Sequence, residues 1–129
     1  MPRSILIVDD EADLAATCAR LLRRRGYGVV AATSRQEGLA ALENDRHDLV
    51  VADLRLPDGD GLDILRAARA LSSSRPVIVI TGFASDPTRQ EAFTAGAAAF
   101  LSKPFSLVEF ADLVERLLGP SASDSPPRH

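Results

Sequence analysis

Residues 5–11 read ILIVDDE, four apolar and mostly β-branched residues followed directly by three acids. A short continuous apolar run of this kind is typical of a strand whose two faces are both covered. Similar runs occur at residues 49–52 (LVVA) and 77–80 (VIVI), and weaker ones at 28–32 and 98–101. The sequence therefore predicts five short strands, three of them covered on both faces.

A helical pattern of apolar residues follows each of these runs. Three helices are expected at about residues 12–25, 61–71 and 86–96. Two more begin at the capping boxes Ser34–Glu37 and Ser106–Glu109, where a serine precedes a glutamate by three positions. Strict alternation of strand and helix requires parallel strands with helices on both faces of one sheet. The predicted fold class is α/β, a three-layer (βα)5 arrangement.

Length, composition and charge limit the possible classes of protein. The chain has 129 residues, 46% of them hydrophobic and 26% charged, which fits one globular domain. We expect that domain at residues 1–119, with residues 120–129, rich in Ser and Pro, as a flexible tail or the start of a linker. A net charge of −3 argues against direct nucleic-acid binding. No apolar run has the ~18 residues of a membrane span, and Cys18 has no second cysteine to pair with, so a cytoplasmic protein is expected.

Polar residues follow four of the five predicted strands. Asp9 and Asp10 follow the first strand, Asp53 the third, Thr81 the fourth and Lys103 the fifth. The carboxyl ends of parallel strands meet at one edge of the sheet, so these side chains should converge. Three neighbouring carboxylates repel one another unless a cation joins them. Oxygen ligands favour a hard divalent cation, and the small number of carboxylates favours Mg²⁺ over Ca²⁺.

This set of side chains fits phosphoryl chemistry. A carboxylate can act as a nucleophile toward phosphorus, and a metal ion, an ammonium and a hydroxyl can share the charge on the phosphoryl oxygens. Lys103 is the only lysine among 15 basic residues, and Gly82 beside Thr81 leaves space for the backbone to approach. Taken singly, each residue has an ordinary explanation, such as a helix cap, a turn or a solvated charge. Their common position at one sheet edge favours a functional site.

Four segments identify a family resemblance. They are residues 5–11, 53–61 (DLRLPDGDG), 77–82 (VIVITG) and 95–105 (AGAAAFLSKPF). In this order and spacing, the chain resembles the receiver domain of two-component response regulators over about residues 4–118. The resemblance implies a flavodoxin-like, CheY-like five-stranded parallel sheet of order 2-1-3-4-5. It also implies a signalling switch rather than an enzyme.

The resemblance assigns the phosphoacceptor and the metal ligands. It implies that Asp53 accepts a phosphoryl group from the phosphohistidine of a sensor histidine kinase or a phosphotransfer protein. It further implies that Asp10 and Asp53 coordinate Mg²⁺ by their side chains and Arg55 by its backbone carbonyl. Asp9 is expected to act mostly through water.

The resemblance also assigns the residues that read the phosphoryl group. Thr81 and Lys103 would contact its oxygens, and the peptide bond before Pro104 is expected to be cis. Phe100 matches the aromatic residue that turns inward when the threonine moves. The fourth helix, fifth strand and fifth helix would then signal to an output domain or a downstream protein, with a homodimer on phosphorylation as one possible outcome.

Three residues flank the expected pocket, namely Arg55, Gly82 and Phe83. The position two residues after the threonine influences hydrolysis of the phosphoryl group in this family. We therefore expect the bulk of Phe83 to restrict water and to lengthen the lifetime of the phosphorylated form.

Other classes of protein fit the residues less well. A phosphate-ester hydrolase with an aspartyl-phosphate intermediate usually has a second acid two positions after the nucleophile, where this chain has Arg55. A dinucleotide or flavin binder would need a glycine-rich loop after the first strand, where two acids would repel a pyrophosphate. The alternative that stays open is a receiver-like interaction module that signals without phosphorylation. The identity of the kinase and of any output domain also stays open.

Overall fold

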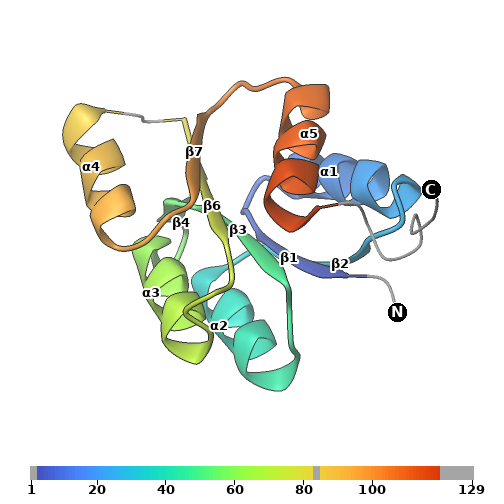
Figure 1. Cartoon of the computed structure of the whole chain (residues 1–129). Helices are drawn as coiled ribbons and strands as arrows, with labels where there is room; N and C mark the ends of the chain where they lie inside the picture. The colour runs from blue at the N-terminus through green and yellow to red at the C-terminus, as the bar shows by residue number, and fades with distance from the viewer. Residues whose placement is uncertain (1–2, 83–84, 120–129) are drawn as a thin grey trace.

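The computed structural model describes residues 3–82 and 85–119 of the chain (Figure 1). Phe83 and the predicted tail at residues 120–129 lie outside the described residues. Five parallel strands form the main sheet, namely β1 (Ser4–Val8), β2 (Gly28–Ala32), β3 (Leu49–Asp53), β6 (Val77–Thr81) and β7 (Ala99–Ser102). Their order is β2-β1-β3-β6-β7, which confirms the predicted order 2-1-3-4-5.

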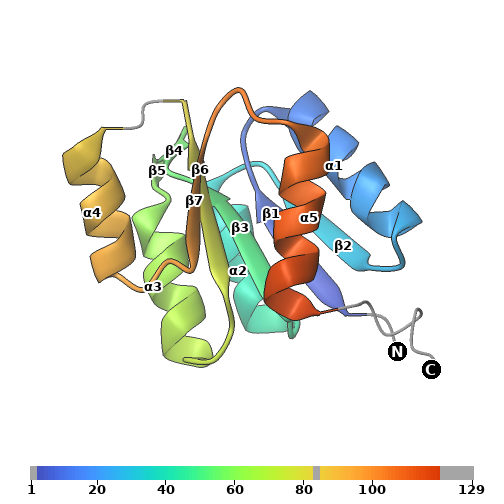
Figure 2. The same ribbon diagram turned by 45° about the horizontal axis from the view of Figure 1, so that its top comes forward.

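Helices cover both faces of this sheet, as the strand patterns predicted. They are α1 (Ala12–Arg24), α2 (Arg35–Asn44), α3 (Leu62–Leu71), α4 (Asp86–Thr94) and α5 (Leu107–Leu118). Figures 1 and 2 show α1 and α5 side by side on one face, with α2, α3 and α4 on the other. In the part of the chain that the structure describes, none of these helices has the length and apolarity needed to cross a bilayer.

The central strands send alternate side chains into two separate hydrophobic cores. In β1, Ile5 and Ile7 pack toward α1 and α5, whereas Leu6 and Val8 pack toward α2 and α3. All four side chains are buried. Because successive residues of a strand point to opposite faces, a strand between two cores must be apolar at every position. This requirement explains the continuous apolar runs of the sequence.

The helices begin where the capping residues predicted, with one difference in the bonding. The hydroxyl of Ser34 accepts a hydrogen bond from the Glu37 amide at 3.1 Å, and Ser106 accepts one from Glu109 at 3.2 Å. The Glu37 carboxylate, however, accepts its bond from the amide of Thr33, one residue before the cap. The first half of the predicted capping box at α2 is therefore formed, and the second half is shifted by one residue.

A short hairpin follows β3, where the sequence predicted only a loop. Strands β4 (Arg55–Leu56) and β5 (Gly59–Asp60) pair antiparallel, and the chain then enters α3 through Gly61. The Gly61 amide donates to the carbonyl of Leu54 at 2.9 Å. A Cβ atom at Gly61 would lie 1.9 Å from the Asp53 carbonyl oxygen, so the chain closes against the end of β3 at a distance that only glycine permits.

A buried polar cluster ties the loops at the opposite edge of the sheet. The imidazole of His47 is 3% exposed, and its Nδ1 lies 3.0 Å from the Ser4 hydroxyl. Arg75 donates to the carbonyls of His47 at 3.1 Å and Ala68 at 2.8 Å. Burial lowers the pKa of His47, and the Arg75 charge acts in the same direction, against the opposing influence of the Ala41 carbonyl and of nearby acids. The imidazole of His47 is therefore protonated less readily in the folded protein than in the unfolded chain.

We expect this cluster to make stability depend on pH near neutrality. The folded-state pKa of His47 is below the ordinary value of 6.5. The contribution of the neutral imidazole to the free energy of unfolding is therefore fully present above pH 6.5. As the pH falls below it, the unfolded chain takes up a proton that the folded state resists, and the free energy of unfolding decreases. Urea denaturation at several pH values between about 5.5 and 7.5 measures this slope. The slope should be smaller in His47→Asn, and an equal slope in both proteins would contradict the prediction.

Candidate functional site

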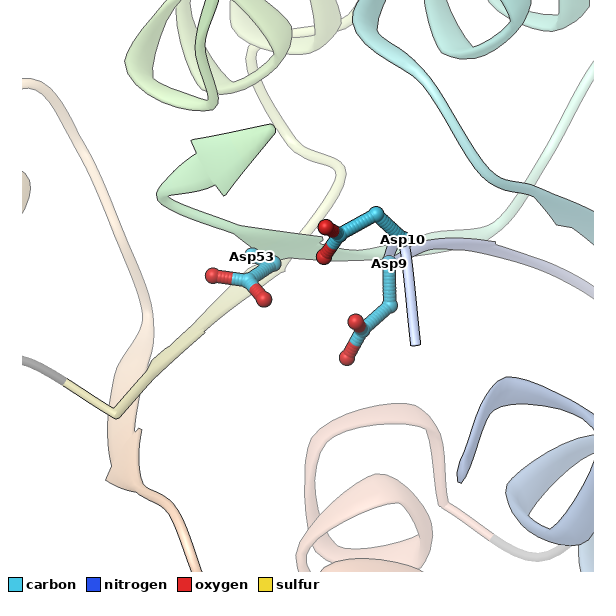
Figure 3. Close-up of side chains that lie close together, drawn as sticks. All are labelled: Asp9, Asp10 and Asp53. Atoms are coloured by element: carbon cyan, nitrogen blue, oxygen red, sulfur yellow. The ribbon is translucent and has the colours of Figure 1, made fainter. Parts of the chain in front are cut away.

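Three carboxylates meet at the carboxyl end of the sheet. Asp9 and Asp10 follow β1 and Asp53 ends β3 (Figure 3), and one oxygen from each lies within 4.8 Å of the others. The two strands are neighbours, and Val8 is paired with Ala52, which brings the next residue of each strand together. Asp9 and Asp53 are buried, whereas Asp10 is exposed. The structure therefore brings together the three acids that the sequence selected.

Lys103 reaches this cluster from the loop between β7 and α5. Its ammonium nitrogen lies 2.8 Å from Asp53 Oδ2 and 3.0 Å from Asp9 Oδ2. The side chain of Lys103 is 13% exposed, so most of it is shielded from water by the protein. Its backbone amide donates to the carbonyl of Thr81 at 2.9 Å, which holds the loop against the end of β6.

Burial and hydrogen bonds shift the pKa values of Asp9 and Lys103. Burial raises the pKa of Asp9, and hydrogen bonds from the Glu11 amide and the Lys103 ammonium only partly oppose this increase. Burial alone would lower the pKa of Lys103, but its hydrogen bonds to the Asp53, Glu11 and Asp9 carboxylates outweigh that effect and raise it. Lys103 therefore stays positively charged at neutral pH, opposite several carboxylates.

The other predicted pocket residues surround this centre. The side chain of Thr81 is buried at the end of β6, and Gly82 beside it is exposed. A Cβ atom at Gly82 would approach only Lys103 Cβ, at 4.0 Å, so crowding does not require glycine there. The Arg55 amide donates to Asp53 Oδ1 at 3.0 Å. The bond between Lys103 and Pro104 is a cis peptide, the geometry that the family resemblance implied.

Phe100 lies on β7 and contacts α4. Its side chain is 9% exposed, and its ring centre lies 6.4 Å from that of Phe93. The guanidinium carbon of Arg89 lies 4.8 Å from the centre of the Phe100 ring, within the range of a cation–π contact. Phe100 is therefore a packed residue that links β7 to two side chains of α4.

Glu11 is a pocket residue to which the sequence analysis assigned no role. Its carboxylate accepts a hydrogen bond from the Lys103 ammonium at 2.5 Å, although the Glu11 side chain is 60% exposed. Glu11 occupies the N-cap position of α1, but its side chain makes no capping bond there. Its position next to Asp10 was the only available signal, because a sequence does not show which way a loop side chain points.

Acidic side chains outnumber the Lys103 ammonium that contacts them. One ammonium faces the carboxylates of Asp9, Asp53 and Glu11, with Asp10 beside them. Clustered carboxylates with excess negative charge provide the hard oxygen ligands that divalent cations prefer. The acidic cluster is thus of the kind that typically binds a divalent metal ion.

Comparison with known proteins identifies the class. The family model of the response regulator receiver domain matches residues 5–115. The chain belongs to this family, whose members are the signalling switches of two-component systems rather than enzymes and work with histidine kinases.

The relatives agree with this assignment. The chain is 37% identical to the transcriptional regulatory protein PdtaR of Mycobacterium tuberculosis over 118 residues, which cover 89% of this chain and 56% of that protein. The chain thus spans about half the length of the curated relatives it matches. A CheY-like receiver domain protein from Methanospirillum hungatei has a TM-score of 0.86 and 33% identity, covering 91% of this chain and 94% of its own. A Burkholderia pseudomallei response regulator solved with a phosphorylated aspartic acid, calcium ion and citrate has a TM-score of 0.79 and 29% identity, covering 96% and 75%.

Proposed function

We propose that Asp53 accepts a phosphoryl group from the phosphohistidine of a histidine kinase or a phosphotransfer protein. The observation that carries this proposal is the position of the Asp53 carboxylate. It lies 2.8 Å from the ammonium of the only lysine of the chain and within 4.8 Å of carboxylate oxygens of Asp9 and Asp10. These residues come from the carboxyl ends of three strands that are far apart in the sequence, and a purely structural role does not require them to meet.

The reaction follows from the groups around Asp53. One carboxylate oxygen of Asp53 attacks phosphorus, the phosphorus–nitrogen bond of the phosphohistidine breaks, and its electron pair stays on the imidazole nitrogen. The product is an acyl phosphate on Asp53. The Lys103 ammonium and the Thr81 hydroxyl would contact the phosphoryl oxygens and stabilise their negative charge.

The acidic cluster fits Mg²⁺ as the metal ion. The side chains of Asp10 and Asp53 and the backbone carbonyl of Arg55 would hold the ion, and Asp9 would act mostly through water. Bound Mg²⁺ would neutralise the charge of the cluster and of the transferred group. The donors are all oxygens from few carboxylates, which suits an ion that retains several waters.

The proposed readout is the face formed by α4, β7 and α5. Phe100 supports this proposal because it lies in β7 (Ala99–Ser102) and packs against Phe93 and Arg89 of α4. Movement of Thr81 toward the phosphoryl group would change the space available to Phe100 and shift this face. An output domain, a downstream protein or a second copy of the chain would read the change. We propose that the switch operates in the cytoplasm as a domain of residues 1–119.

Acetyl phosphate tests the proposal without a kinase. In the presence of Mg²⁺ we expect intact-mass spectrometry to show a gain of one phosphoryl group, because a small acyl phosphate supplies the same phosphorus electrophile. Removal of Mg²⁺ with EDTA should prevent the gain. A protein that stays unmodified under both conditions would contradict the proposal and favour an interaction module that works without phosphorylation.

A further inference from the structure

Asp58 binds the first turn of a helix that lies far from it in the sequence. Its Oδ1 accepts a hydrogen bond from the Arg35 amide at 2.7 Å, and its Oδ2 accepts one from the Gln36 amide at 2.9 Å. These amides are the first two of α2, whereas Asp58 lies in the turn between β4 and β5. The hairpin is thus fastened to α2 by a bidentate carboxylate.

A second contact holds the same hairpin from the side. The Arg35 side chain runs along Gly59, where a Cβ atom would lie 2.4 Å from Arg35 Cδ. It then donates from Nε to the Asp63 carboxylate on α3 at 2.8 Å. The hairpin turn is therefore held between the start of α2 and the first turn of α3.

The hairpin also carries the backbone that borders the acidic cluster. Strand β4 begins at Arg55, whose amide donates to Asp53 Oδ1 and whose pairing partner on β5 is Asp60. Because the two strands are only two residues long, a shift of the turn at Asp58 shifts the Arg55 peptide as well. In the proposed function the backbone carbonyl of Arg55 binds the metal ion.

We propose that Asp58 is a positioning residue for the metal site, acting through the hairpin on the Arg55 carbonyl and the Asp53 carboxylate. This inference rests on the proposed function. It assigns to the Asp58 contact a role beyond stabilising α2, namely setting the affinity of the site for Mg²⁺. A residue that only caps α2 would have no such effect.

Ser34 provides the matched control. Its hydroxyl caps the same helix by accepting a hydrogen bond from the Glu37 amide, and among the described residues no side-chain bond of Ser34 reaches the hairpin. Ser34→Ala and Asp58→Ala therefore each remove a cap from α2, and only the second releases the hairpin. We expect Asp58→Ala to weaken Mg²⁺ binding about tenfold, as measured by calorimetric titration of the full chain. Ser34→Ala should stay within about twofold of the wild type.

Other outcomes separate this inference from the proposed function. Equal effects of the two variants, or unchanged Mg²⁺ affinity in Asp58→Ala, would overturn the inference and leave the proposed function intact. If the wild type itself does not bind Mg²⁺, both are wrong. Asp58→Asn, which retains one acceptor oxygen, should show a smaller loss of affinity and replaces Asp58→Ala if that variant does not fold. Hydrogen exchange at the Arg55 amide should be faster in the Asp58 variants alone.

Discussion

Asn in place of Asp53 is expected to abolish the gain of one phosphoryl group from acetyl phosphate. The amide has nearly the same shape as the carboxylate, and its single oxygen can still accept the bond that the Arg55 amide donates to Oδ1, although the bond from Lys103 to Oδ2 is lost. It lacks the anionic oxygen that attacks phosphorus, so no acyl phosphate can form. Intact-mass spectrometry after incubation with Mg²⁺ and acetyl phosphate measures the loss.

Asp112→Asn is the matched control for this experiment. Asp112 is an exposed carboxylate on α5 that pairs with Arg25, away from the acidic cluster. The same change of charge and size at this position should leave the phosphoryl gain intact. A full gain in Asp53→Asn would show that another side chain is the acceptor, and the assignment of Asp53 would be wrong.

Ala in place of Gly61 is expected to cause the largest loss of stability among single-methyl additions at the site. The added Cβ would lie 1.9 Å from the Asp53 carbonyl oxygen and 2.7 Å from its carbonyl carbon. These are backbone atoms, so no side-chain rotation can relieve the overlap. We expect the free energy of unfolding to fall by about 3 kcal/mol, the upper range for overpacking, in urea denaturation.

Gly28→Ala tests whether crowding is the cause. Gly28 lies in β2, and a Cβ atom there would approach the Arg3 carbonyl oxygen only to 3.8 Å, an ordinary contact. Its effect on unfolding should stay below about 1 kcal/mol. A similar loss of unfolding free energy in both variants would show that steric overlap of the added Cβ atom is not the cause. Because the Gly61 variant moves the end of β3, slower phosphorylation of Asp53 should accompany its instability.

The sheet could be predicted because its signals are local. The run at residues 5–8 is apolar at every position, and such a run has few structural solutions other than a strand between two cores. The convergence of Asp9, Asp53 and Lys103 then follows from parallel topology alone, since each residue lies at the end of a strand or directly after it. Neither inference needs to know how a particular side chain is oriented.

The features that escaped prediction depend on tertiary contacts. The pairing of Arg55 with Asp60 leaves no periodic pattern, because each strand has only two residues. Asp58 caps a helix that begins 23 residues earlier, and capping rules based on neighbouring positions cannot detect such a bond. Glu11 follows two acids, and only the folded loop shows that its carboxylate contacts Lys103.

Because the chain has a single lysine, the reactivity of that side chain can be used to follow the state of the site. Lys103 has the only side-chain amine in the chain, since the other 14 of the 15 basic residues are arginines. An acylating reagent that attacks primary amines needs the neutral nitrogen, which the surrounding carboxylates keep scarce. Its rate of reaction with this one side chain therefore reports how tightly the acids hold the ammonium. Binding of a cation or modification of Asp53 would register as a change in that rate, without any engineered probe.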